Sequence, residues 1–130
     1  MKGSDVQTIL IVDDEPLIRA LLALVLNRAG FSVLTADSGF DALLISQSRR
    51  GEIGLLITDI TLPGMNGWTL AREVIAADPD LPVLFMSAGC ADWDLDRYEH
   101  AEFLAKPFSI ASLLTEVQNL LGETSVHGVS

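Results

Sequence analysis

The sequence predicts an α/β fold made of a single, doubly wound, five-stranded parallel sheet with helices on both faces. Short apolar runs alternate with longer helix-like stretches about five times along the chain. Apolar runs bounded by polar or turn residues are typical of the buried strands of a parallel sheet. Alternation of strand and helix implies right-handed crossover connections, which cover both faces of the sheet with helices. Hydrophobic residues make up 49% of the chain, which is enough for the core of such a layered fold.

The length of the chain, 130 residues, matches one domain of about 100–200 residues. We find no internal repeat and no low-complexity segment that would divide it. We therefore expect one domain over residues 8–122, with an N-terminal tail over 1–7 and a C-terminal tail over 123–130.

The expected strands are short and rich in aliphatic and β-branched residues, which favour a buried strand. Turn-forming or polar residues bound each of them. The strands are expected over residues 8–13, 31–36, 54–59, 82–87 and 102–105.

The expected helices are indicated by capping residues and by the spacing of apolar residues. The first helix has Pro16 at its start and Gly30 just past its end, which is the preferred placement of these residue types. Ser38 begins a capping box, and Ser109 can cap a last helix whose apolar residues recur on one face. The helices are expected over residues 16–29, 38–49, 68–77, 91–99 and 110–121.

Composition excludes several classes of function. The formal charge of −10, with eight lysines and arginines, argues against direct nucleic-acid binding and against docking on anionic lipid. Cys90 is the single cysteine, so the chain can form neither an internal disulfide nor a cysteine-built zinc site. The longest apolar stretch, residues 20–26, is far shorter than the roughly 20 residues that span a bilayer. We expect a cytoplasmic protein without membrane insertion, or the cytoplasmic part of a larger membrane-bound kinase.

Chemically active residues follow the strands at the ends where ligands bind in open α/β sheets. Asp13 and Asp14 follow the first strand, and Asp59 ends the third. Ser87 ends the fourth strand, and Lys106 comes directly after the fifth. Carboxylate oxygens suit a hard cation such as Mg²⁺, whereas a hydroxyl and an ammonium suit a phosphoryl group. The sequence therefore predicts a metal and phosphoryl site at one edge of the sheet.

Each of these residues also has a plainer interpretation. Asp13 and Asp14 can cap the following helix, and Asp59 can simply begin a turn. Ser87 can be a capping hydroxyl, and Lys106 can be a solvated surface amine. Taken together, these residues favour the functional interpretation, because three carboxylates at one edge repel one another unless a metal cation or an ammonium lies among them. A carboxylate can also act as a nucleophile and become an aspartyl phosphate.

Over residues 8–121 the sequence resembles the receiver domains of bacterial two-component response regulators. Every site position of that family is filled here by an acceptable residue type in the same order. The matching residues are the acid pair Asp13 and Asp14, the phosphoacceptor Asp59, the switch residue Ser87 with the small Ala88 after it, the aromatic switch Phe103, and the pair Lys106 and Pro107.

The resemblance implies a flavodoxin-like sheet ordered 2-1-3-4-5 and a cis peptide before Pro107. It implies Mg²⁺, for which Mn²⁺ can substitute, held by Asp14, Asp59 and the backbone carbonyl of Thr61, with Asp13 acting mostly through water. Thr61 and Gly89 lie two residues beyond the phosphoacceptor and the switch serine. By the same resemblance, these two residues influence how long the phosphoryl group lasts.

The function implied is that of a phosphorelay switch rather than an enzyme. A histidine kinase or a histidine phosphotransfer protein donates a phosphoryl group to Asp59, Ser87 moves toward it, and Phe103 swings inward. A downstream partner then reads the face formed by the expected helix over 91–99, the strand over 102–105 and the last helix. Only self-phosphorylation from small donors and slow self-dephosphorylation are expected as activities.

Two other functions stay open at this point. A small Mg²⁺-dependent phosphohydrolase with an aspartyl nucleophile is disfavoured, because the acid pair is adjacent rather than Asp-x-Asp and no cap domain is evident. A receiver that binds partners without being phosphorylated is disfavoured by the complete set of site residues. Residues 84–87 and 104–109 are most similar to C-terminal receivers of hybrid sensor histidine kinases, so the chain is either a stand-alone receiver or such a domain.

Overall fold

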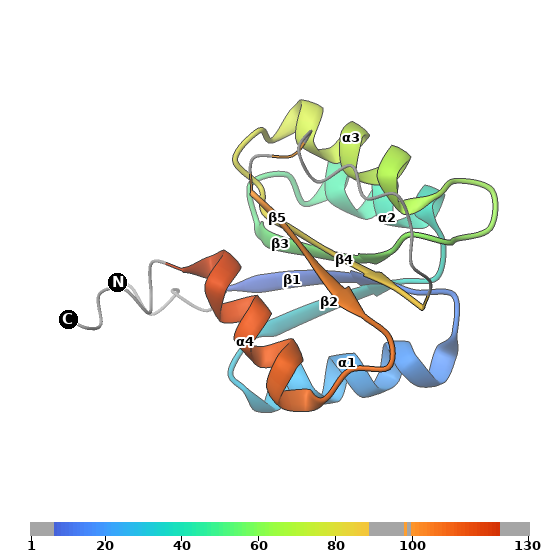
Figure 1. The fold of residues 1–130 in the computed structure, drawn as a ribbon. Helices are drawn as coiled ribbons and strands as arrows, with labels where there is room; N and C mark the ends of the chain where they lie inside the picture. The colour runs from blue at the N-terminus through green and yellow to red at the C-terminus, as the bar shows by residue number, and fades with distance from the viewer. Residues whose placement is uncertain (1–6, 89–97, 99, 123–130) are drawn as a thin grey trace.

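The computed structural model describes residues 7–88, 98 and 100–122. Its sheet has five strands in the order β2-β1-β3-β4-β5, and every neighbouring pair is parallel (Figure 1). Both the fold class and the strand order agree with the expectation. The strands are β1 (Thr8–Val12), β2 (Ser32–Ala36), β3 (Ile53–Asp59), β4 (Val83–Ser87) and β5 (Ala101–Ala105).

Helices cover both faces of the sheet. Figure 1 shows α1 and α4 on one face and α2 and α3 on the other. The described helices are α1 (Pro16–Arg28), α2 (Gly39–Ser48), α3 (Gly67–Ala77) and α4 (Ile110–Leu121). None of these is long and apolar enough to cross a membrane. Apart from Tyr98, which is in no helix, the expected helix over 91–99 lies outside the described residues, as do most of both expected tails.

Capping side chains explain where three of the helices begin. The side-chain oxygens of Ser38 and Ser109 each accept a hydrogen bond from the backbone N–H three residues further on, at 3.1 and 3.0 Å. Asn66 caps α3 in the same way at 2.9 Å. Each such bond satisfies a backbone donor of the first helical turn. Gly30, with a φ of 101°, follows the end of α1, where a left-handed residue is favoured.

The core has two layers because successive side chains of a strand point to opposite faces. On β1, Leu10 and Val12 pack under α2 and α3, whereas Ile9 and Ile11 pack under α1 and α4. The central strands are buried on both faces, as the continuous apolar runs predicted. This rigid two-sided core positions the carboxyl ends of the strands on which the site is built.

Replacing the buried Leu56 by Ala should lower the free energy of unfolding by about 2–5 kcal/mol, because the change leaves a cavity in the middle strand. Leu44→Ala on α2 is the matched control, since Leu44 is 65% exposed and its loss should change stability by no more than about 0.5 kcal/mol. Urea unfolding followed by circular dichroism measures both variants. Equal losses in the two variants would contradict this placement of the core.

Candidate functional site

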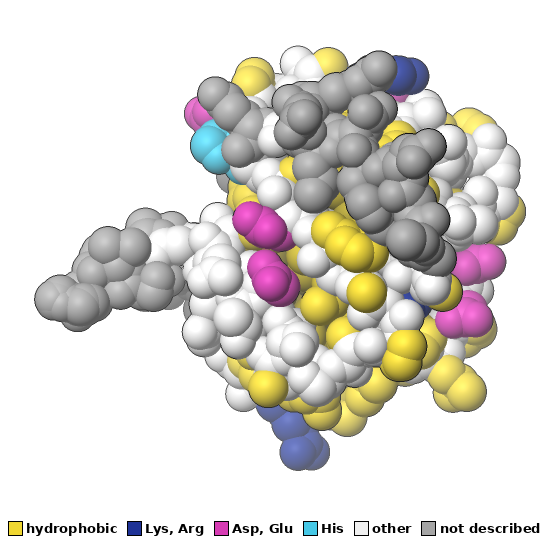
Figure 2. All heavy atoms as spheres, in the orientation of Figure 1, with side chains coloured by type: hydrophobic (Ala, Val, Ile, Leu, Met, Phe, Trp, Pro, Cys, Tyr) yellow, Lys and Arg dark blue, Asp and Glu magenta, His cyan; other side chains and the backbone are white. Residues whose placement is uncertain are grey.

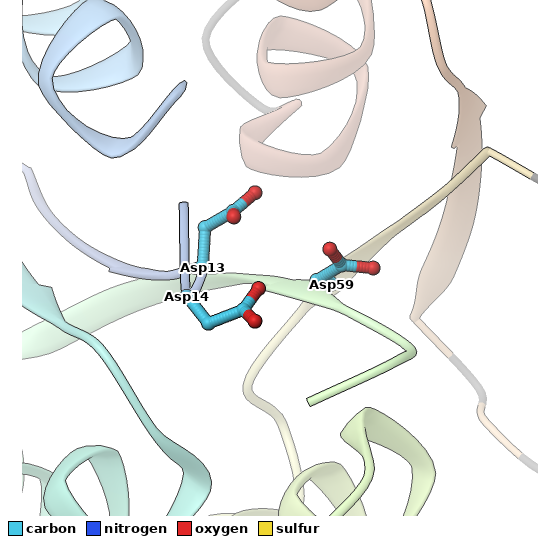
Figure 3. Close-up of side chains that lie close together, drawn as sticks. All are labelled: Asp13, Asp14 and Asp59. Carbon is cyan, nitrogen blue, oxygen red and sulfur yellow. The ribbon is translucent and has the colours of Figure 1, made fainter. Parts of the chain in front are cut away.

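Three carboxylates meet at the carboxyl edge of the sheet. Asp13 and Asp14 follow β1, and Asp59 is the last residue of β3. Each offers an oxygen within 4.8 Å of the others, and Figure 3 shows the three side chains lying close together at the ends of their strands. The nitrogen Nζ of Lys106, just after β5, lies 3.0 Å from Oδ2 of Asp13 and 3.0 Å from Oδ2 of Asp59. The predicted convergence of the acids and the amine is therefore observed.

Asp13 is buried and held through all of its polar groups. Its backbone N–H donates to the carbonyl of Ala36 at 3.2 Å. Its carboxylate accepts from the backbone N–H of Glu15 at 2.9 Å and from Lys106. Its carbonyl accepts from Nη1 of Arg19 at 2.7 Å. Because both of its carboxylate oxygens accept hydrogen bonds, Asp13 is suited to position the other groups of the site rather than to bind a ligand directly.

Asp14 and Asp59 are the carboxylates that solvent can reach. Asp14 is exposed, and Asp59 keeps 8% of its surface exposed. Oδ1 of Asp59 accepts from the backbone N–H of Thr61 at 3.2 Å, and Oδ2 accepts from Lys106. Asp59 therefore also begins a turn, as the plainer interpretation held. That interpretation fits the acid pair less well, because the residue that caps α1 is Glu15.

The charges of the site favour a divalent cation. Burial would lower the pKa of Lys106, but hydrogen bonds to Asp59 and Asp13 and the charges of both carboxylates outweigh it and raise the pKa above 10.5. Lys106 is therefore an ammonium at neutral pH. Three carboxylates and one ammonium leave a formal charge of −2, and hard carboxylate oxygens are ligands that Mg²⁺ accepts. The residues present thus fit the expected metal.

Ser87 lies at the end of β4, beside the carboxylates. It is buried, and its carbonyl accepts from the backbone N–H of Lys106 at 2.8 Å, so the ends of β4 and β5 are joined there. Ala88, directly after it, is exposed. The peptide between Lys106 and Pro107 is cis, as the family resemblance implied. Gly89 lies outside the described residues, so its expected influence on the phosphoryl lifetime stays a prediction.

An aromatic cluster below Ser87 was not foreseen. The rings of Trp68 and Phe85 are 4.3 Å apart between centroids, and Tyr98 lies 5.7 Å from Trp68 and 5.3 Å from Phe85. The hydroxyl of Tyr98 also donates to the carbonyl of Trp68 at 3.1 Å. Phe103, opposite Phe85 in the register of β4 and β5, packs against the same core layer. Trp68 is a packing residue, and the cluster connects α3 to β4.

Gly67 allows α3 to begin directly against the end of β3. A Cβ at this position would lie 2.3 Å from the carbonyl oxygen of Asp59 and 2.9 Å from the Cα of Ile60. The backbone N–H of Gly67 donates to the carbonyl of Ile60 at 2.8 Å. A glycine before a predicted helix was the available signal, but the close approach depends on tertiary packing that the sequence does not display.

Comparison with known proteins identifies a family. Residues 9–118 match the sequence profile of the response regulator receiver domain. The response regulator receiver protein CpdR of Brucella abortus is 34% identical over 116 residues, which cover 87% of this chain and 95% of CpdR. The sensor kinase CckA of Brucella abortus is 36% identical over 118 residues, which are 88% of this chain. The chain spans only 12% of the length of CckA.

Solved structures agree with the sequence relatives. The receiver domain of the hybrid histidine kinase CckA superposes with a TM-score of 0.78 at 34% identity, covering 88% of this chain and 98% of that domain. A response regulator receiver protein from Sinorhizobium medicae superposes with a TM-score of 0.83 at 32% identity, covering 91% and 96%.

Removing the ammonium of Lys106 should destabilise the fold in a way that depends on pH. Lys106→Met leaves Asp13 and Asp59 without their common partner, so it should lower the free energy of unfolding at neutral pH. The folded pKa of Lys106 is raised. The stabilisation is therefore complete below the unfolded pKa of about 10.5 and is lost as the pH rises through the higher folded pKa.

Chemical unfolding at a series of pH values measures this effect. Wild type and Lys106→Met should differ clearly at neutral pH and converge above pH 10.5, the ordinary pKa of the amine. Lys2, the other lysine of the sequence, supplies the control, because Lys2→Met should follow wild type throughout. A constant difference between Lys106→Met and wild type at every pH would show that the amine does not stabilise the carboxylates.

Proposed function

The chain belongs to the response regulator receiver domain family, and from this premise we propose that Asp59 is its phosphoacceptor. We assign Mg²⁺ to Asp14, Asp59 and the backbone carbonyl of Thr61, with Asp13 acting mostly through water. Mn²⁺ can take the same place. Lys106 and Ser87 are the groups that bind the phosphoryl oxygens. Receiver domains work in two-component signalling, so the phosphorylated site serves as a switch.

The convergence of carboxylates and amine is the observation that supports this proposal, and it favours Asp59 among the three acids. Asp13 is fully buried, and both of its carboxylate oxygens accept hydrogen bonds. Among the described residues, Lys106 forms ion pairs with Asp13 and Asp59. Asp59 is thus the carboxylate that is both reachable from solvent and in contact with the ammonium. A nucleophile at this position has a fixed cation beside the group that it attacks.

The transfer itself needs positioning and charge neutralisation rather than a proton-transfer catalyst. An oxygen of Asp59 forms a bond to phosphorus while the bond from phosphorus to the donor nitrogen breaks, and its electron pair stays on the departing imidazole. When bound, Mg²⁺ supplies neutralisation of the charge on the transferring group. Lys106 stays protonated because of its raised pKa, so its ammonium can bind one phosphoryl oxygen.

Phosphorylation then changes the balance between two arrangements of the domain. The new group adds about −1.5 to −2 charges, which attract the ammonium of Lys106 and the hydroxyl of Ser87. Movement of Ser87 leaves space into which Phe103 turns. The phosphoryl group must bind the active arrangement more tightly, because a ligand shifts an equilibrium only by its difference in affinity.

A histidine kinase or a histidine phosphotransfer protein is the proposed donor. The downstream partner reads the face of β5 and α4 together with residues 91–99, of which Tyr98 belongs to the described part of the chain. Figure 2 shows acidic side chains beside apolar ones on this side of the molecule. Burial and the neighbouring charge of Glu102 raise the pKa of Glu116 there. We place the domain in the cytoplasm, without direct nucleic-acid binding and without catalysis on outside substrates.

Asp59→Asn should abolish labelling of the protein by radioactive acetyl phosphate in the presence of Mg²⁺, because the amide is a far weaker nucleophile. Asp80→Asn is the matched control, since Asp80 is exposed at the opposite end of the sheet and should be labelled like wild type. The radioactivity bound per mole of protein on the gel, counted for each variant, gives the stoichiometry. Undiminished label on Asp59→Asn would contradict the choice of acceptor.

Two further measurements distinguish the competing functions. Release of many equivalents of inorganic phosphate from a generic phosphate ester would indicate a phosphohydrolase instead. Failure of both acetyl phosphate and a histidine kinase to label the folded wild-type protein would indicate a receiver that binds its partners without phosphorylation.

Asp14→Asn should retain the phosphoacceptor Asp59 but require a higher Mg²⁺ concentration for the same rate of labelling.

A further inference from the structure

A guanidinium group is bound to the backbone of the acidic turn. Nη1 of Arg19 donates a hydrogen bond to the carbonyl oxygen of Asp13 at 2.7 Å. Arg19 lies in the second turn of α1 and is half-buried. Hydrogen bonds from a charged donor are shorter and stronger than neutral ones. This bond therefore spans the connection from β1 to α1, joining residues that are six positions apart in the sequence.

The start of α1 has Pro16 but lacks the side-chain cap bond that commonly holds such a connection. The capping residue Glu15 makes no side-chain cap bond, and the first turn carries no acidic residue, within the part of the chain that the structure describes. The turn is held instead by Asp13, through its bonds to Ala36 and Glu15, and by Arg19. The carbonyl that Arg19 binds belongs to the planar peptide that continues into Asp14. A bond that fixes this carbonyl therefore also fixes the peptide plane that carries the backbone nitrogen of Asp14.

We propose that Arg19 is a positioning residue for the divalent cation, because it fixes the peptide between Asp13 and Asp14 and so aims the exposed Asp14 carboxylate at Asp59. This inference rests on the proposed function, in which Asp14 and Asp59 bind Mg²⁺. Asp14 is exposed, so its orientation depends on the backbone beneath it. Groups that orient metal ligands typically change metal affinity about 10–100-fold when they are removed.

Because Arg19 is charged, the direction in which the Mg²⁺ affinity changes on its removal tests the inference. A positive charge near the site repels Mg²⁺, so loss of the charge alone would tighten the binding of the metal. Loss of positioning has the opposite effect and weakens the binding. A positional effect also persists at high salt, which screens interactions between exposed charges.

Calorimetric titration with MgCl₂ at low and at high salt tests the inference without phosphorylation. Arg19→Gln should raise the Kd for Mg²⁺ by about 10-fold or more. Arg19→Lys should recover part of the loss, because an ammonium can donate to the same carbonyl. Arg72→Gln removes the same charge from an exposed position on α3 and should leave the Kd unchanged. Unfolding of each variant in EDTA checks that the fold persists.

Each outcome of the titration decides the matter. An unchanged or lower Kd for Arg19→Gln, with wild type binding Mg²⁺, overturns the positioning role while the proposed function stands. The same holds if Arg19→Gln loses stability in EDTA but binds Mg²⁺ like wild type, because Arg19 is then only structural. If the wild-type protein binds no Mg²⁺, the proposed function itself fails, and the inference fails with it.

Discussion

The ion pairs of Lys106 with Asp13 and Asp59 are the interaction on which the rest of the site depends. They join residues 93 and 47 positions apart in the sequence, and they bring a cation to two carboxylates that the ends of β1 and β3 would otherwise crowd together. Isolated buried carboxylates are costly unless they are paired. Since β4 lies between β3 and β5, the side chain of Lys106 has to pass the end of β4, where Ser87 and Ala88 are small. The order of the strands and the size of these residues are thus linked.

Residue parity along the strands connects this site to the core. Side chains two apart on a strand share a face, so Ser87 continues the row in which Phe85 lies. Phe85 contacts Trp68 and Tyr98, and Phe103 sits opposite it on β5. Ser87 and Phe103, the proposed switch residues, therefore lie beside an aromatic cluster within a largely aliphatic core layer. A movement of Ser87 would change the packing of this cluster, which includes Trp68 at the start of α3.

Much of the fold could be predicted because its signals are local. Ser38 and Ser109 are capping residues that act within one turn, and the apolar runs before Asp13 and Asp59 mark buried strands directly. The convergence of the acids followed from the general geometry of parallel sheets, whereas the strand order needed the family resemblance. Three contacts were missed: the approach of Gly67 to the carbonyl of Asp59, the stacking of Tyr98 on Trp68, and the bond from Arg19 to Asp13. Each depends on how layers pack, which residue spacing does not encode.

The scarcity of lysine has a practical consequence for chemical probes of this domain. Lys106 is the single lysine among the described residues, and its side chain is only 15% exposed. Amine-reactive cross-linkers and acylating dyes will therefore find few sites on the folded domain, and reaction at Lys106 would neutralise the cation between the carboxylates. Mapping of its complexes is better served by reagents directed at carboxyl groups, of which the surface offers many.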